Sequence, residues 1–245
     1  MSDIGKIIGR QREIVLLQEI YESPKAEFVA VYGRRRIGKT YLIDKMFEDK
    51  YDFYMTGIYE GTRKEQLTNF AHQLEVYSKT EQKVPKDWME ALFMLRKYIE
   101  TLKHKKRIVL FIDEMPWLDT RYSRFLKAFE LFWNEWASKL DNLKLIVCGS
   151  ATTWMTNTLL GNKGGLHNRV TRSIYLRPFN LGETEEFLVS RGFQMERFQI
   201  AELYMTMGGT PFYLNMLSRS QSVAQNIDEL FFSADAPLRS EYGFL

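Results

Sequence analysis

The chain has 245 residues, of which 45% are hydrophobic and 27% charged, a balance typical of a soluble globular protein rather than of a disordered, collagen-like or coiled-coil chain. Its 34 basic and 31 acidic residues leave a net charge of +3, so overall charge does not indicate a nucleic acid partner. A single cysteine, no signal-like N-terminal stretch and no apolar run near the roughly 20 residues that span a bilayer predict a cytoplasmic chain without disulfides or membrane segments.

Strand-length apolar runs alternate with helical patterns as far as Leu176. Continuous β-branched and aromatic runs are typical of strands buried on both faces, whereas apolar residues spaced by three and four indicate helices. The patterns predict helices at 13–21, 39–47, 64–79, 87–103 and 122–140 and strands at 28–32, 51–58, 108–112, 143–148 and 173–176. This alternation predicts an α/β fold with a parallel sheet flanked by helices. The aromatic side of the helix at 122–140 is expected in the core.

The pattern changes near Pro178. Beyond it only helices are predicted, at 183–190, 196–205, 212–217 and 223–232. Glycine and proline interrupt them at Gly192 and around Pro211. We therefore expect a core domain over residues 1–178 and a small all-helical subdomain over 179–245.

Residues 33–40 directly follow the first predicted buried strand and fit the Walker A pattern G-x-x-x-x-G-K-[ST]. Glycines let such a loop curl, so that backbone amides and the start of the next helix face a phosphate. Lys39 is expected to reach the β- and γ-phosphates, and the Thr40 hydroxyl to ligate Mg²⁺. The nucleotide-binding residues expected here are Gly33, Arg34, Arg35, Arg36, Ile37, Gly38, Lys39, Thr40 and Tyr41.

Polar residues follow two further predicted strands. Asp113 and Glu114 come after the strand at 108–112, which predicts a Walker B site in which Asp113 holds Mg²⁺ and Glu114 activates the attacking water. A solvated acidic turn is the alternative, and the upstream Walker A pattern argues against it. Ser150 follows the strand at 143–148. It either bonds the γ-phosphate or the attacking water as a sensor, or caps a helix beginning near Thr152.

Four stretches carry a resemblance to a known family. They are 8–13 (Ile-Gly-Arg-Gln-Arg-Glu), 32–40, 111–114 (Phe-Ile-Asp-Glu) and 208–214 (Gly-Gly-Thr-Pro-Phe-Tyr-Leu). Together and in this order they resemble the prokaryotic archaeal-type ATPases, which lie between the AAA+ and STAND branches of the P-loop NTPases. The resemblance covers essentially the whole chain, and it implies a helical lid over the nucleotide and ATP with Mg²⁺ as cofactors.

The resemblance also implies roles for single residues. Gly9 and Arg10 would flank the adenine, and Pro211 would pack near the adenine or ribose. Residues 166–169 resemble the family's arginine-bearing segment, so Arg169, with Arg172 as the alternative, would be an arginine finger acting in cis or in trans. The alternatives are an Arg10 salt bridge to a helix and a simple helix break around Pro211. In this family winged-helix and nuclease-like domains commonly follow the lid, which leaves the output function open.

The leading hypothesis is a Mg²⁺-dependent ATP-binding switch with slow hydrolysis. A nucleotide-stabilised scaffold without turnover is one alternative, and a small-molecule P-loop kinase, disfavoured by the Asp113–Glu114 pair, is another. A protein partner or a second copy of the chain is compatible with all three. The basic clusters at 34–36 and 103–107 lack interleaved aromatic residues, so they give DNA binding little support. The scattered histidines and the lone Cys148 predict no zinc site.

Overall fold

The computed structural model describes residues 7–161, 163–239 and 241. Their contacts divide them into two units. The first, here called the sheet unit, comprises Gln11–Arg34 and Lys39–Leu176. The second, here called the helical unit, comprises residues 7–10, Arg35–Gly38, 177–239 and 241.

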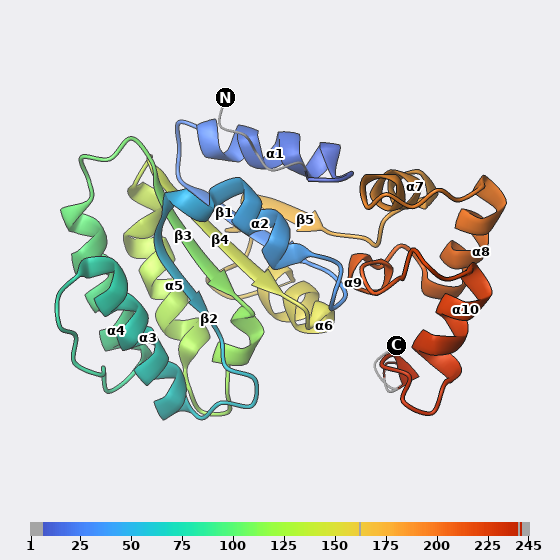
Figure 1. Cartoon of the computed structure of the whole chain (residues 1–245). Coiled ribbons are helices and arrows are strands. Elements are labelled where there is room, and N and C mark those ends of the chain that lie inside the picture. Colours follow the sequence, from blue (N-terminus) through green and yellow to red (C-terminus); the bar gives the residue numbers. More distant parts are fainter. Residues whose placement is uncertain (1–6, 162, 240, 242–245) are drawn as a thin grey trace. The chain divides into compact units, whose positions relative to one another are not determined.

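The sheet unit carries all the strands found in the described residues (Figure 1). Its elements are α1 (Gln11–Glu22), β1 (Glu27–Tyr32), α2 (Lys39–Phe47), a 3₁₀ turn (Glu48–Lys50), β2 (Tyr51–Thr56), α3 (Arg63–Ser78), α4 (Trp88–Thr101), β3 (Ile108–Asp113), a 3₁₀ turn (Met115–Leu118), α5 (Phe125–Glu135), a 3₁₀ turn (Ala137–Lys139), β4 (Leu143–Gly149), α6 (Thr152–Trp154), a π-helix (Met155–Leu160) and β5 (Arg172–Tyr175). The predicted alternation of strands and helices is confirmed.

The five strands form one parallel sheet in the order β2-β3-β4-β1-β5. Strand β4 therefore lies between β1 and β3, with Gly149 paired to Tyr32 and Val147 paired to Ile112. Because parallel strands end at the same edge, the segments that follow β1, β3 and β4 meet at the carboxyl edge of the sheet.

Helices cover both faces of the sheet, with α1 and α2 along one face and α3, α4 and α5 along the other (Figure 1). Strands β3 and β4 are buried at every position, which explains their continuous apolar sequences. Aromatic rings dominate the core beneath α3 to α5: Trp88 packs edge-on against Phe125 with ring centroids 4.9 Å apart, and Phe28 packs against Trp133 at 5.0 Å. The predicted burial of the aromatic helix face is confirmed.

The predicted helix at 122–140 is too long, because α5 spans only Phe125–Glu135. Tyr122 and Arg124 have φ values of 64° and 57°, which an α-helix does not accommodate. At the other end Trp136 has φ −137° and ψ −58°, and a 3₁₀ turn follows. The three- and four-residue apolar spacing thus continues through a turn at each end, where the residues still pack inward without being α-helical.

The helical unit has its own small apolar core, which includes Leu203, Leu214 and Leu238. Its elements are α7 (Leu181–Ser190), α8 (Arg197–Met207), α9 (Pro211–Leu214), α10 (Val223–Ile227) and a π-helix (Asp228–Phe232). As predicted, no described residue after Leu176 lies in a strand. The described chain also holds no helix with the length and apolar character needed to cross a membrane.

One lysine is fully buried in the sheet. Lys144 of β4 pairs in register with Glu27 of β1, and its ammonium donates to the backbone carbonyls of Lys25 and Asp141. Burial, followed by the nearby charge of Arg107, lowers the pKa of Lys144 to about 8.

Candidate nucleotide-binding site

The loop between β1 and α2 is curled by three residues with positive φ. Gly33, Arg36 and Gly38 have φ values of 145°, 70° and 86°. A Cβ at Gly38 would meet no atom within 4 Å, so this position needs glycine for its backbone conformation and not for space. Alternation of such conformations along a loop turns successive amides toward one side, which is how phosphate loops bind anions.

Lys39 lies across this loop. The residue is 6% exposed, and its ammonium donates to the backbone carbonyls of Gly33 at 3.0 Å and Arg34 at 2.9 Å. A buried ammonium held against the loop backbone places a positive charge where a polyphosphate would be cradled.

Thr40 and Asp113 bring the start of α2 to the end of β3. The Thr40 hydroxyl donates to Asp113 Oδ2 at 2.8 Å, and the Glu114 amide donates to Asp113 Oδ1 at 3.0 Å. Asp113 is 5% exposed, and burial raises its carboxyl pKa. The Thr40 hydrogen bond opposes that rise in pKa, and the neighbouring Glu114 charge adds to it.

Glu114 points to the end of β4 and not to open solvent. Its Oε2 accepts hydrogen bonds from the Ser150 amide and the Ser150 hydroxyl, both at 2.9 Å. The N-cap of α6 is Ala151, which makes no side-chain cap bond, so the interpretation of Ser150 as a helix cap is wrong. Because Asp113 is buried and the Glu114 carboxylate is held by the amide and hydroxyl of Ser150, the solvated-turn interpretation of this pair also fails.

The comparison with known families decides the assignment. Residues 7–217 match the family described as an ATPase domain predominantly from Archaea. The chain belongs to this family. An uncharacterized protein of Methanocaldococcus jannaschii is 29% identical over 238 residues, covering 97% of this chain and 49% of that protein. The chain thus spans about half the length of this curated relative.

Solved structures share the fold of this archaeal-type ATPase domain. The Walker-type ATPase of Pyrococcus abyssi matches with a TM-score of 0.64 and 16% identity, over 97% of this chain and 75% of that one. The ORC2 protein of Aeropyrum pernix, solved as ADPNP and ADP complexes, matches with a TM-score of 0.63 and 14% identity, over 92% of this chain and 69% of that one. A STAND protein with a tetratricopeptide repeat sensor from Pyrococcus horikoshii matches with a TM-score of 0.57 and 18% identity, over 98% of this chain and 35% of that one. The expected α/β P-loop fold with a helical C-terminal part is confirmed.

The ATPase domain holds Gly9 and Arg10 within its helical unit. Both have φ of 63°, and the Arg10 amide donates to Glu183 Oε1 at 3.0 Å. Arg10 is 5% exposed, and its guanidinium donates to the carbonyls of Arg177 at 2.6 Å and Ile37 at 3.1 Å. The expected role of this pair beside the adenine stays a prediction, and so does the alternative of an Arg10 salt bridge to a helix.

Glu183 and Phe179 are contacts of Arg10 that the sequence reasoning missed. The Arg10 guanidinium lies 4.6 Å from the Phe179 ring centroid. Glu183 also forms a capping box with Asn180 at the start of α7. The Asn-x-x-Glu spacing at 180–183 predicts the start of a helix. It does not predict the contact of Glu183 with Arg10, which lies 173 residues away in sequence.

The remaining loop side chains differ in exposure. Arg34, Arg35 and Tyr41 are exposed, with Tyr41 at 55%, whereas Ile37 is buried. Arg36 alone of the three arginines is partly buried, and its guanidinium pairs with Glu241 within the helical unit.

Pro211 occupies the first turn of α9, directly after a tight contact. The Phe179 amide donates to the Gly209 carbonyl at 2.7 Å, and a Cβ at Gly209 would lie 1.8 Å from the Phe179 carbonyl oxygen. The glycine is therefore required by close approach of two backbone segments. The placement of Pro211 against a base or ribose stays a prediction.

The arginine-finger candidates both lie in the sheet unit. Arg169 and Arg172 are exposed; Arg169 follows a turn in which its amide donates to the Leu166 carbonyl, and Arg172 begins β5.

The second basic cluster, by contrast, supports the fold. Lys105 pairs with the buried Asp52 at 2.6 Å, and Arg107 donates to the last carbonyls of α1, those of Tyr21 and Glu22. These two side chains are thus committed to contacts within the sheet unit.

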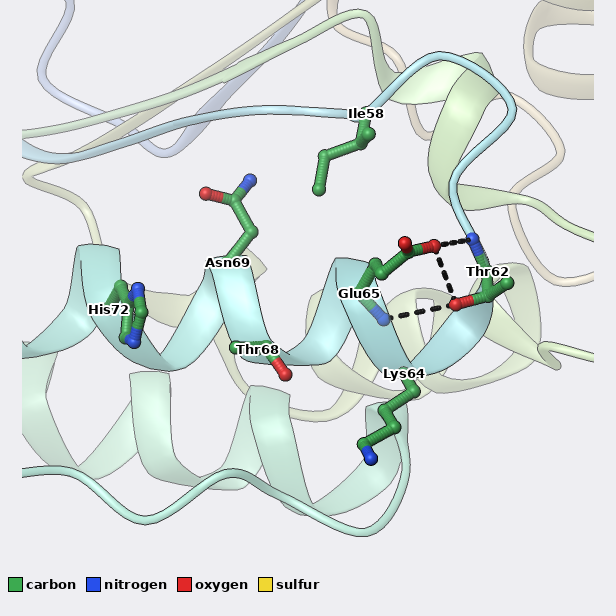
Figure 2. A pocket seen from close by; sticks show the side chains of 7 residues that line it. All are labelled: Ile58, Thr62, Lys64, Glu65, Thr68, Asn69 and His72. Atoms are coloured by element: carbon green, nitrogen blue, oxygen red, sulfur yellow. Dashed lines mark hydrogen bonds between the residues drawn. The ribbon is translucent and has the colours of Figure 1, made fainter.

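A shallow cavity of about 580 Å³ lies along α3, away from the motifs above in sequence (Figure 2). Its lining is Ile58, Thr62, Lys64, Glu65, Thr68, Asn69 and His72. Figure 2 shows the capping box of Thr62 and Glu65 at one end, and Asn69 donates to the Thr56 carbonyl at 2.8 Å. These polar groups stabilise the start of α3 and contact the end of β2, so we interpret the cavity as part of the surface of α3.

Proposed function

We propose that this chain binds ATP with Mg²⁺, hydrolyses it slowly and acts as a nucleotide-driven conformational switch. The observation that carries the proposal is the 2.8 Å contact between Thr40 and Asp113, because it joins the curled loop to the acidic end of β3. Membership of an ATPase domain family supports the general assignment.

The donor set at this contact fits a magnesium ion. The Thr40 hydroxyl and the Asp113 carboxylate offer hard oxygen ligands, and Mg²⁺ in nucleotide sites is typically held by one or two such groups with water and phosphate. A buried carboxylate with a raised pKa is also one that a nearby cation would stabilise in its ionised form. When bound, Mg²⁺ would neutralise charge on the β- and γ-phosphates.

The chain's own groups then divide the work of hydrolysis. The loop amides and Lys39 would hold the polyphosphate. Glu114 would take a proton from a water molecule as that water's oxygen bonds to the γ-phosphorus. The bond from the γ-phosphorus to the bridging oxygen breaks, and its electron pair leaves with ADP. Ser150 would set the direction of the Glu114 carboxylate.

The proposed turnover is slow because the arginine finger, Arg169, would act on the nucleotide of a second copy of the chain. Arg169 is exposed, which suits an arginine supplied to a second copy of the chain. An arginine finger accelerates phosphoryl transfer by roughly 10³ to 10⁵, so a lone chain without one would turn over slowly.

Phosphate release by the purified chain tests the proposal. Glu114→Gln is expected to keep nucleotide affinity and abolish release, whereas Lys39→Ala is expected to weaken binding itself; EDTA should stop release in the unmodified chain. The exposed Glu81→Gln serves as a matched control that changes neither. Binding without release in every form would favour the scaffold, and a labelled phosphorylated acceptor would favour the kinase.

The proposal extends to the helical part and to partners. Residues 179–245 would act as a lid, with Gly9, Arg10 and Pro211 near the base. A second copy of the chain is the partner that a finger in trans requires, and a nucleotide-dependent mass in solution would support it. DNA binding is tested by retention at low salt, and no retention would remove it.

A further inference from the structure

Arg36 occupies the one position of the phosphate loop where a residue other than glycine has positive φ. Its φ is 70°, between Gly33 and Gly38, which also have positive values. The left-handed conformation is unfavourable for a residue with a Cβ, so the loop holds this curl only where other contacts compensate.

The compensating contacts come from the C-terminal part of the same unit. Arg36 Nη1 lies 2.5 Å from Glu241 Oε2, and the side chains are 25% and 13% exposed. The guanidinium also lies over the Phe212 ring, 4.4 Å from its centroid. The Tyr213 hydroxyl donates to the same Glu241 oxygen at 3.0 Å. A carboxylate and a ring face therefore contact the Arg36 guanidinium, and a hydroxyl holds that carboxylate, while Arg34 and Arg35 are exposed.

We propose that Glu241 is a positioning residue for nucleotide binding, which holds Arg36 and thereby keeps the phosphate loop curled for the polyphosphate. This rests on the proposed ATP-binding function and adds a residue about 200 positions from the loop in sequence to its site. The ion pair is partly buried and is supported by two neighbours, so it is less open to solvent than a surface pair.

The coupling runs in both directions. If the pair favours the curled loop, a nucleotide that requires the curl must favour the pair by the same factor. Nucleotide should then slow hydrogen exchange in the segment that carries Glu241.

A double-mutant cycle tests the proposal. Glu241→Gln is expected to weaken nucleotide binding about fivefold, raising KM with kcat unchanged, because the loop holds substrate and transition state alike. Glycine favours positive φ, so Arg36→Gly should keep the curl without the pair, and the affinity of this variant is the baseline for the second arm of the cycle. In the Arg36→Gly background Glu241→Gln should then have no further effect. The exposed Glu202→Gln is the matched control.

Three outcomes would overturn the proposal: unchanged binding by Glu241→Gln, tighter binding by it, or an equal effect of it in both backgrounds. Far-UV circular dichroism of each variant establishes that it is folded before its affinity is compared. If the unmodified chain binds no nucleotide, the proposed function fails with it; if the unmodified chain binds and Lys39→Ala does not, a failure of the cycle concerns Glu241 alone.

Discussion

Glu114 combines a left-handed backbone with a carboxylate oxygen held by two donors. Its φ is 46°, and Oε2 accepts from both the amide and the hydroxyl of Ser150. Left-handed conformations of residues with a Cβ cost of order 1 kcal/mol and persist where the surroundings fix them. The two bonds from Ser150 thus fix which way the proposed catalytic base points.

Ser150→Ala removes one of these bonds and leaves the amide donor. We expect kcat for phosphate release to fall about tenfold, which corresponds to about 1.4 kcal/mol for one hydrogen bond to a charged group, with KM for ATP unchanged. Steady-state phosphate release measures both constants. The nearby exposed Thr153→Ala should leave both unchanged, and an unaltered kcat in the Ser150 variant would remove Ser150 from the mechanism.

At the scale of elements, the turn between α8 and α9 is set by two backbones in contact. A Cβ at Gly209 would lie 1.8 Å from the Phe179 carbonyl oxygen, a distance that no side-chain adjustment relieves. The turn therefore needs glycine at two positions for two different reasons. Gly208, with φ 59°, is needed for its backbone conformation, and Gly209 is needed because a side chain has no space there.

Gly209→Ala is expected to destabilise the helical unit by about 3 kcal/mol, at the upper end of overpacking effects. Guanidinium unfolding followed by far-UV circular dichroism measures this. All five tryptophans lie in the sheet unit, so tryptophan fluorescence reports that unit separately and should shift less. Gly182→Ala, at the start of α7, is the matched control, with a change within about 1 kcal/mol expected. Equal stability of the two variants would contradict the close-approach argument.

The strands were more predictable than the helices, and for a physical reason. Strands β1, β3 and β4 are buried on both faces, so their sequences are continuous apolar runs with clear ends. Helix ends depend on single backbone conformations, such as the positive φ of Tyr122 and Arg124, which apolar spacing does not encode. For the same reason the predicted helices near Thr152 and at 223–232 did not reveal the π-helical turns that follow α6 and α10.

For the molecule as a whole, Lys144 makes stability depend on pH. Its folded pKa of about 8 lies below the ordinary 10.5, so above pH 8 the unfolded chain holds more protons than the folded one, and stability from this group rises until pH 10.5. Relative to Lys144→Met, the unmodified chain should gain up to about 3 kcal/mol across this window. Any cost of leaving the Lys25 and Asp141 carbonyls without this donor is independent of pH. Guanidinium unfolding at several pH values measures the difference, and parallel curves would contradict it.

The candidate site was predictable where a motif is local and unpredictable where it is assembled across the chain. The pattern at 33–40 and the acidic pair after β3 follow from short segments whose spacing reflects phosphate and metal chemistry. No such pattern indicates the contact of Glu183 with Arg10 or the contacts of Phe212 and Glu241 with Arg36, because each contact joins residues far apart in sequence. Apolar periodicity predicts which face of a helix or strand is buried. It does not predict which distant charged side chain a single carboxylate will contact.

The contacts of residues 35–38 with the helical unit bear on how this chain can be dissected. Arg36 meets Glu241 and the Ile37 carbonyl meets Arg10, so the middle of the Walker A sequence shares a unit with residues at both ends of the described chain. A fragment trimmed to the five strands and their covering helices would retain the whole Walker A sequence and still lack Arg10 and Glu241, whose side chains contact Ile37 and Arg36. For this protein, an intact Walker A sequence therefore does not guarantee that the contacts of the loop side chains are intact.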